Sequence, residues 1–122
     1  MTIEILNQYG ADTTEGLARC MNNEEFYLKM VMLGLSDERF ETLGPVLQAQ
    51  KLEEAFEMCH ALKGVFGNLA LTPLYDAVSE MTELLRARKE MDYLPLYNEI
   101  KAQRDQLLAM EKEQEDNTRG ET

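Results

Sequence analysis

Residues 51–73 read KLEEAFEMCHALKGVFGNLALTP, and their apolar positions recur at intervals of three or four residues. This spacing is typical of an amphipathic α-helix and predicts one long helix from about Leu52 to Leu71. The Thr72-Pro73 pair should end that helix and begin the next, because threonine is a common N-cap and proline is favoured at the first helical position. The segment therefore indicates two consecutive helices joined by a short turn.

The helical pattern extends in both directions, and the alternation of apolar and polar residues that marks a strand is missing. We expect a helix over residues 14–21 and another that begins after a cap at Asn22 or Asn23 and ends near Leu35. A third should cover residues 37–50, with a kink or break at Gly44-Pro45. Two more should run from residue 72 to about 90 and from about 92 to 110, the last with Asp92 as its cap.

These elements predict an all-α fold, an antiparallel four-helix bundle with extra short helices at the N-terminus. Residues 1–12 would form an N-terminal lead-in that has room for a short helix, and residues 13–112 would form the bundle domain. Residues 113–122 would form an acidic tail that frays, because they have nothing to bury.

The composition narrows the classes of function. The 122 residues include 12 Lys or Arg and 23 Asp or Glu, which gives a formal net charge of −11. This length suits one domain, and this charge argues against binding to nucleic acid or to an anionic membrane surface. No apolar run is long enough to cross a bilayer and the first residues do not resemble a signal peptide, so we expect a cytoplasmic protein. In that compartment Cys20 and Cys59 would stay reduced.

His60 is the only histidine, and helical geometry places it on the polar side of its helix. At about 100° per residue, the apolar positions of the helix lie opposite His60, whereas Glu53, Glu57 and Lys63 surround it. We therefore expect the imidazole to face solvent.

Gly64 and Gly67 lie on the same face as His60, and neither is near a predicted helix end. A glycine inside a helix costs about 0.8–1 kcal/mol relative to alanine, so two of them at one place indicate a functional requirement. That requirement would be a bare surface on which a macromolecule brings its own groups to the imidazole. Both glycines are therefore candidate partner-binding residues, with a helix–helix contact as the alternative explanation for Gly67.

An exposed histidine of this kind can carry out few reactions without a partner. An exposed neutral imidazole is a nucleophile, but the sequence places no base partner or oxyanion donor beside His60. It could by itself accept a phosphoryl group on a ring nitrogen, and Lys63, one turn away, could partly neutralise the phosphate. A partner would have to supply Mg²⁺ and the acceptor carboxylate, because phosphoryl transfer depends mainly on positioning and charge neutralisation.

The run His60-Ala61-Leu62-Lys63-Gly64-Val65-Phe66-Gly67-Asn68-Leu69 resembles the signature of histidine-phosphotransfer (HPt) domains, H-x-L-K-G followed by a small residue and N-L. The resemblance covers roughly residues 13–110 and includes the segments 51–56 and 72–74. Ala70 departs from it, because many members have glycine there, and we expect this difference to affect packing only. Cys59 stands where alanine is common, and we expect no redox role for it.

The resemblance implies a phosphorelay carrier of a two-component system rather than an enzyme, and no ATP-binding motif is present. His60 would be the phosphoacceptor, Lys63 would help to hold the phosphate, and Gly64 would leave room for docking. The implied partners are a response-regulator receiver domain and a sensor histidine kinase. The chain would need no cofactor, since the receiver domain brings the Mg²⁺. The sequence leaves the oligomeric state open, and we expect a monomer.

Three other interpretations compete with this one. A helical adaptor would bind receiver domains without carrying phosphate, and a purely structural bundle would carry His60 by accident. A metal site is disfavoured, because only Glu53 and Glu57 could join His60 as ligands.

Overall fold

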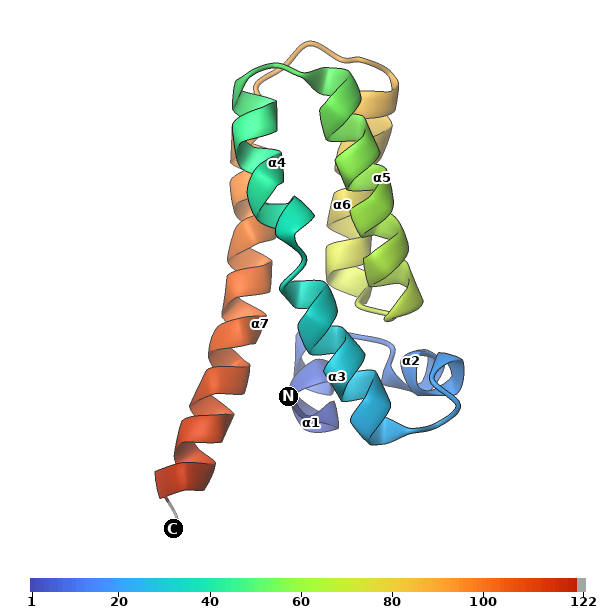
Figure 1. Ribbon diagram of the computed structural model, residues 1–122, viewed down its shortest axis with the longest axis vertical. Helices are drawn as coiled ribbons and strands as arrows, with labels where there is room; N and C mark the ends of the chain where they lie inside the picture. Colours follow the sequence, from blue (N-terminus) through green and yellow to red (C-terminus); the bar gives the residue numbers. More distant parts are fainter. Residues whose placement is uncertain (121–122) are drawn as a thin grey trace.

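The computed structural model describes residues 1–120, with side chains described through residue 116. Over this part of the chain the backbone forms helices and no strands, which confirms the all-α prediction (Figure 1). The helices are α1 (Ile3–Tyr9), α2 (Thr13–Arg19), α3 (Glu24–Leu35), α4 (Glu38–Gln48), α5 (Leu52–Asn68), α6 (Thr72–Arg86) and α7 (Leu94–Gly120). Of the helices in this described part, none has the length and hydropathy needed to cross a membrane.

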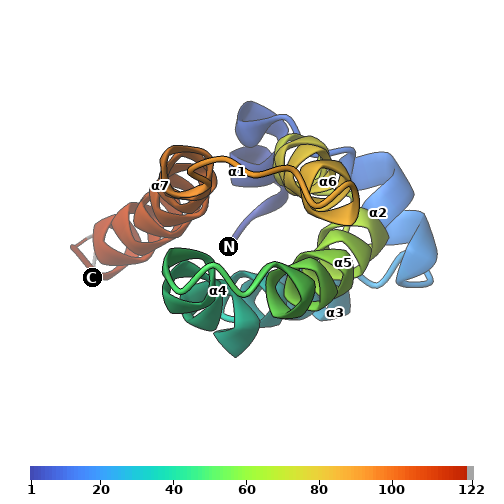
Figure 2. The same cartoon turned by 90° about the horizontal axis from the view of Figure 1, so that it is seen from above.

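Helices α4 to α7 form the predicted antiparallel four-helix bundle. They run alternately up and down in Figure 1, and the view from above in Figure 2 shows α5 between α4 and α6, with α7 closing the bundle. The joints after α4 and α5 are short, and short joints force neighbouring helices to run antiparallel. Helix α5 therefore has its inner side packed against two neighbours and its outer side free.

The interior of the bundle is apolar. Fully burying one large aliphatic or aromatic side chain contributes about 1.5–3 kcal/mol to folding. The largest buried side chains are Tyr27, Tyr93, Phe40, Phe66, Leu6, Leu35, Leu47, Leu62, Leu71, Leu74, Met81 and Leu85. These residues come from α1, α3, α4, α5 and α6 and from the loop positions Leu71 and Tyr93, so two of the N-terminal helices, α1 and α3, share the core of the bundle.

Arg104 of α7 is a charged side chain inside this core. Its guanidinium lies 4.6 Å from the centre of the Phe40 ring and donates hydrogen bonds to the Leu35 carbonyl (3.3 Å) and the Glu41 carboxylate (2.5 Å). A buried cation is tolerated only with such partners. The contacts fasten α7 to the junction between α3 and α4.

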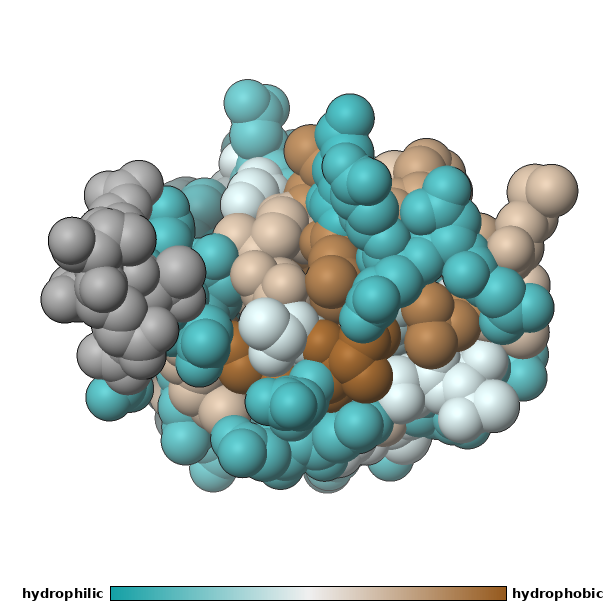
Figure 3. All heavy atoms as spheres, turned by 90° about the horizontal axis from the view of Figure 1, so that it is seen from below, coloured by the Kyte–Doolittle hydropathy of each residue, from teal (hydrophilic) through white to brown (hydrophobic). Residues whose placement is uncertain are grey.

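Helices α1 to α3 close the lower end of the bundle. The side chain of Asn23 accepts a hydrogen bond from the Phe26 amide and caps α3, in agreement with the sequence. Seen from below in Figure 3, this end carries hydrophobic residues among hydrophilic ones. The exposed apolar side chains include Phe26 and Leu33 of α3.

The structure has no break at Gly44-Pro45, where a kink or a break was predicted. Helix α4 continues through Pro45 without a break, and burial of Leu43, Val46 and Leu47 around the proline offsets its missing hydrogen bond. Helix α7 extends to Gly120, and the Glu, Lys and Gln residues near its end are good helix formers. That the chain frays from residue 113 stays a prediction. Residues 121–122 of the predicted tail lie outside the described residues.

The turn between α5 and α6 begins earlier than predicted, because α5 ends at Asn68 rather than Leu71. Ala70 adopts a left-handed conformation with φ of 56°, and the Leu71 amide donates to the Phe66 carbonyl at 3.0 Å. These are features of a Schellman-type helix end, where glycine is the favoured residue. Ala70 therefore affects the backbone, and the expectation that it affects packing only is wrong.

Thr72 is not the N-cap of α6. The N-cap is Leu71, which makes no side-chain cap hydrogen bond, while Thr72 and Pro73 are the first residues of the helix. The Thr72 hydroxyl donates instead to the Ala70 carbonyl at 3.4 Å. The shift follows from the early end of α5, which leaves only residues 69–71 for the turn.

Replacing Ala70 with glycine should raise the free energy of unfolding by about 0.5–1 kcal/mol, because glycine adopts a left-handed conformation without strain. The matched control is Ala77→Gly inside α6, which should lower the same free energy by about 0.8–1 kcal/mol. Urea unfolding of both variants tests this. A loss of stability in Ala70→Gly would mean that packing of the alanine methyl outweighs the backbone strain.

Candidate functional site

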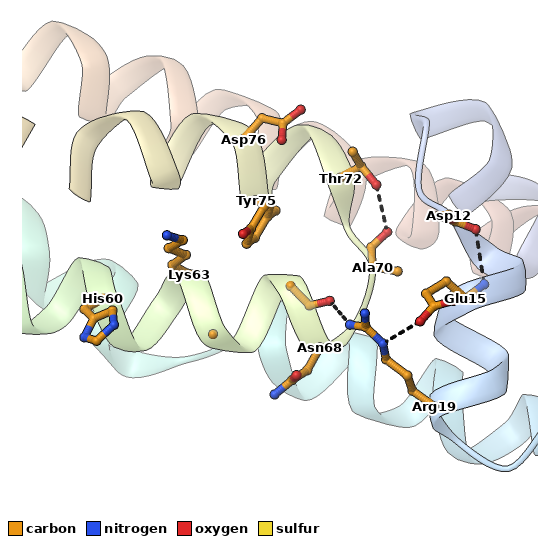
Figure 4. A pocket seen from close by; sticks show the side chains of 12 residues that line it. Asp12, Glu15, Arg19, His60, Lys63, Asn68, Ala70, Thr72, Tyr75 and Asp76 are labelled. Atoms are coloured by element: carbon orange, nitrogen blue, oxygen red, sulfur yellow. Dashed lines mark hydrogen bonds and ion pairs between the residues drawn. The ribbon is translucent and has the colours of Figure 1, made fainter. Parts of the chain in front are cut away.

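His60 lies on the outer side of α5 and is exposed, as helical geometry predicted. Its ring stacks on Phe56, one turn earlier, with ring centres 5.7 Å apart and ring planes 14° apart. In the described part of the chain, no side chain or carbonyl forms a hydrogen bond or ion pair with the imidazole. Figure 4 shows the ring directed away from the axis of α5. The exposed ring therefore has no hydrogen-bond partner among the described residues that an incoming group would have to displace.

Two guanidinium groups lie close to the Phe56 ring of this stacked pair. The guanidinium carbon of Arg86 is 5.0 Å from the centre of the Phe56 ring, and that of Arg88 is 5.5 Å away. Cations favour the face of an aromatic ring, so Phe56 links two arginines at the end of α6 to the histidine. None of these three residues was predicted as part of the site. Phe56 could have been found from its spacing of four residues before His60, but the arginines could not.

Lys63 follows His60 by one turn, and its side chain is half-buried. Its ammonium nitrogen lies 5.9 Å from the centre of the Tyr75 ring. In Figure 4, Lys63 and Tyr75 extend toward one another between α5 and α6, whereas His60 leaves α5 in another direction. Lys63 is thus placed beside the histidine as predicted, but its ammonium group is held by a ring that the sequence analysis did not identify.

Gly64 and Gly67 differ in the space around them. A Cβ atom added at Gly64 would meet no atom within 4 Å, so Gly64 lies in open space beside His60, as predicted. A Cβ atom at Gly67 would come within 3.0 and 3.1 Å of two carbons of the Tyr75 ring. Packing against α6 therefore explains Gly67, and only Gly64 supports the prediction of a bare patch.

A groove of about 590 Å³ extends from His60 along α5 to α2. It is lined by Asp12, Glu15, Arg19, His60, Lys63, Gly64, Gly67, Asn68, Ala70, Thr72, Tyr75 and Asp76. Helix α2 is tied to this region because Arg19 donates to the Gly67 carbonyl at 2.5 Å and the Asp12 amide donates to the Ala70 carbonyl at 2.9 Å. This contribution of α2 was not predictable, since nothing in the sequence places α2 against the end of α5.

Cys59 precedes His60 in the chain but is fully buried. Burial raises the pKa of the Cys59 thiol to about 12, so the thiol stays protonated at neutral pH and is a poor nucleophile. Within the described residues, no group of three His, Cys, Asp or Glu side chains is arranged to hold a metal ion. Of the two neighbouring side chains, Cys59 and His60, only the imidazole of His60 is exposed.

Comparison with known proteins gave one match. The family model of the Hpt domain matches residues 28–110, about two thirds of the chain, and the match includes His60, Lys63 and both glycines. It begins at residue 28, later than the resemblance noted from the sequence, so α1 and α2 lie outside it. No curated protein and no solved structure matched the chain.

Proposed function

This chain belongs to the Hpt domain family, and from that membership we propose that His60 carries a phosphoryl group to or from the aspartate of a receiver domain. Hpt domains are phosphocarrier modules of two-component phosphorelays and are not kinases, so the protein takes part in such a relay. The observation that supports the role of His60 is its exposed ring beside Gly64, where a Cβ atom would meet nothing within 4 Å.

The transfer balances without a further reactant. A lone pair on one ring nitrogen of His60 attacks the phosphorus of the aspartyl phosphate, and a P–N bond forms as the P–O bond to the partner's carboxylate breaks. The carboxylate leaves with the electron pair, and the other ring nitrogen keeps its proton. The reverse reaction passes the phosphoryl group to another receiver domain. In this proposal the receiver domain contributes the Mg²⁺.

Basic side chains near His60 would favour a negatively charged phosphoryl group on its ring. Lys63 lies one turn along α5, and Arg86 and Arg88 lie against the Phe56 ring that stacks on His60. Arg86 is paired with the Glu83 carboxylate at 3.2 Å, whereas among the described residues no ion pair involves Lys63 or Arg88. Because the groups are exposed or half-buried, water screens them, and their effect on the rate of transfer should be larger than their effect on stability.

The direct test is label transfer. A receiver domain is charged with radioactive phosphate from acetyl phosphate, freed of the donor and mixed with the protein. We expect label to move to the protein, to be lost in acid and to survive in alkali, as a phosphohistidine does. Denatured protein is the control. Absence of label on the folded protein, across receiver domains that charge normally, would refute the proposal.

A further inference from the structure

The ring of Tyr75 lies across α5 at the point where α5 has no side chain. Two ring carbons of Tyr75 are so close to Gly67 that a Cβ atom there would approach them to 3.0 and 3.1 Å, which is tighter than ordinary contact. Glycine at position 67 therefore lets the α6 side chain lie flat against the backbone of α5. Figure 4 shows the ring in the space between the two helices, next to Lys63.

This ring is the contact that holds Lys63. The distance of 5.9 Å from the ammonium nitrogen to the ring centre is within the range of a cation–π interaction. Among the described side chains, no carboxylate lies within ion-pair distance of Lys63. Acidic residues nevertheless line the same groove, and two of them are engaged elsewhere: Glu15 pairs with Arg19, and Asp12 caps α2.

The kind of contact matters for an incoming phosphoryl group. A carboxylate would neutralise Lys63, and phosphate would have to displace it. An aromatic ring orders the flexible side chain but leaves its charge uncompensated, so less conformational freedom remains to be lost when phosphate arrives.

We propose that Tyr75 is a positioning residue for Lys63, admitted by Gly67, which keeps the ammonium group ordered, charged and unpaired beside the phosphoacceptor. This inference rests on the proposed function, because it concerns the charge that would meet the phosphoryl group on His60. The inference also assigns a role to Gly67. The glycine makes room for the Tyr75 ring and is not itself part of a bare docking surface.

The test measures how fast His60 is phosphorylated by potassium phosphoramidate, a small anionic donor that needs no partner protein. In this reaction the P–N bond to His60 forms as the P–N bond of the donor breaks and ammonia leaves. The Tyr75→Leu protein should react about two- to five-fold more slowly than wild type, the size expected for loss of one cation–π contact. Tyr75→Phe keeps the ring face and should react at the wild-type rate.

Two further variants separate positioning from general damage. In a Lys63→Gln background, Tyr75→Leu should cause no additional loss, because Tyr75 acts through Lys63. Gly67→Ala displaces the ring without removing it and should slow the reaction in the same direction. Thermal melting of each variant accompanies the rates, and Gly67→Ala provides the test if Tyr75→Leu does not fold.

The outcomes distinguish the inference from the function on which it rests. Wild type that accepts label from a receiver domain, together with an unchanged phosphoramidate rate in Tyr75→Leu, would overturn the inference alone. An equal loss with and without Lys63 would also overturn it. Wild type that accepts no label from a charged receiver domain would overturn the proposed function, and the inference with it.

Discussion

The His60→Gln protein is expected to fold, to bind receiver domains and to accept no phosphoryl group at all. Glutamine lacks the nucleophilic ring nitrogen, and His60 is the only histidine in the chain. Because the side chain is exposed on α5 and glutamine is a good helix former, the free energy of unfolding should change by less than about 0.5 kcal/mol. Label transfer, receiver binding by calorimetry and urea unfolding measure the three properties.

Glu54→Gln is the matched control. It introduces the same residue on the same helix, at another exposed position that helical geometry turns away from His60, and it should transfer label like wild type. The adaptor interpretation predicts a different pattern, in which wild type takes no label and His60→Gln binds and functions as well as wild type. Equal labelling of wild type and His60→Gln would place the phosphoryl group on another residue.

The Gly64→Gln protein is expected to be more stable than wild type and much slower in the relay. Glycine inside a helix costs about 0.8–1 kcal/mol relative to alanine, and a Cβ atom added at Gly64 meets no atom within 4 Å. The same side chain would stand between α5 and a docked receiver domain. A misplacement of about 1 Å in such a reaction can reduce the rate about 100-fold, and we expect a loss of that order.

Single-turnover transfer from a charged receiver domain and thermal melting together test this prediction. Phosphorylation of Gly64→Gln by phosphoramidate should remain near the wild-type rate, because that small donor does not need the docking surface. A variant that is more stable but transfers normally would show that Gly64 lies outside the interface. A variant that loses both reactions would show damage to His60 itself.

The local features of the site were predictable because they follow from one helix. The outward direction of His60, the position of Lys63 one turn later and the open face at Gly64 depend only on the rise and twist of α5. The cap at Asn23 was predictable for the same reason, since an N-cap is satisfied within the first turn of its own helix.

Features that depend on how helices meet were not predictable. Gly67 has the same position on the helical wheel as a docking glycine, and only the packing of α6 brings Tyr75 over it. Arg86 and Arg88 are exposed residues at the end of α6, and their closeness to Phe56 depends on the register between α5 and α6. The early end of α5 depends on the left-handed conformation of Ala70. In a sequence such a helix end is recognised by glycine, and alanine at this position does not indicate it.

The central claim is that the phosphoryl group is held by a ring nitrogen of His60, and nuclear magnetic resonance tests it most directly. The protein is labelled with ¹⁵N-histidine, mixed with a charged receiver domain, and examined for one-bond coupling between phosphorus and a ring nitrogen. With a single histidine in the chain, any such coupling belongs to His60. We expect one ring nitrogen to couple to phosphorus. A folded protein that receives phosphate while both ring nitrogens remain uncoupled would contradict the account.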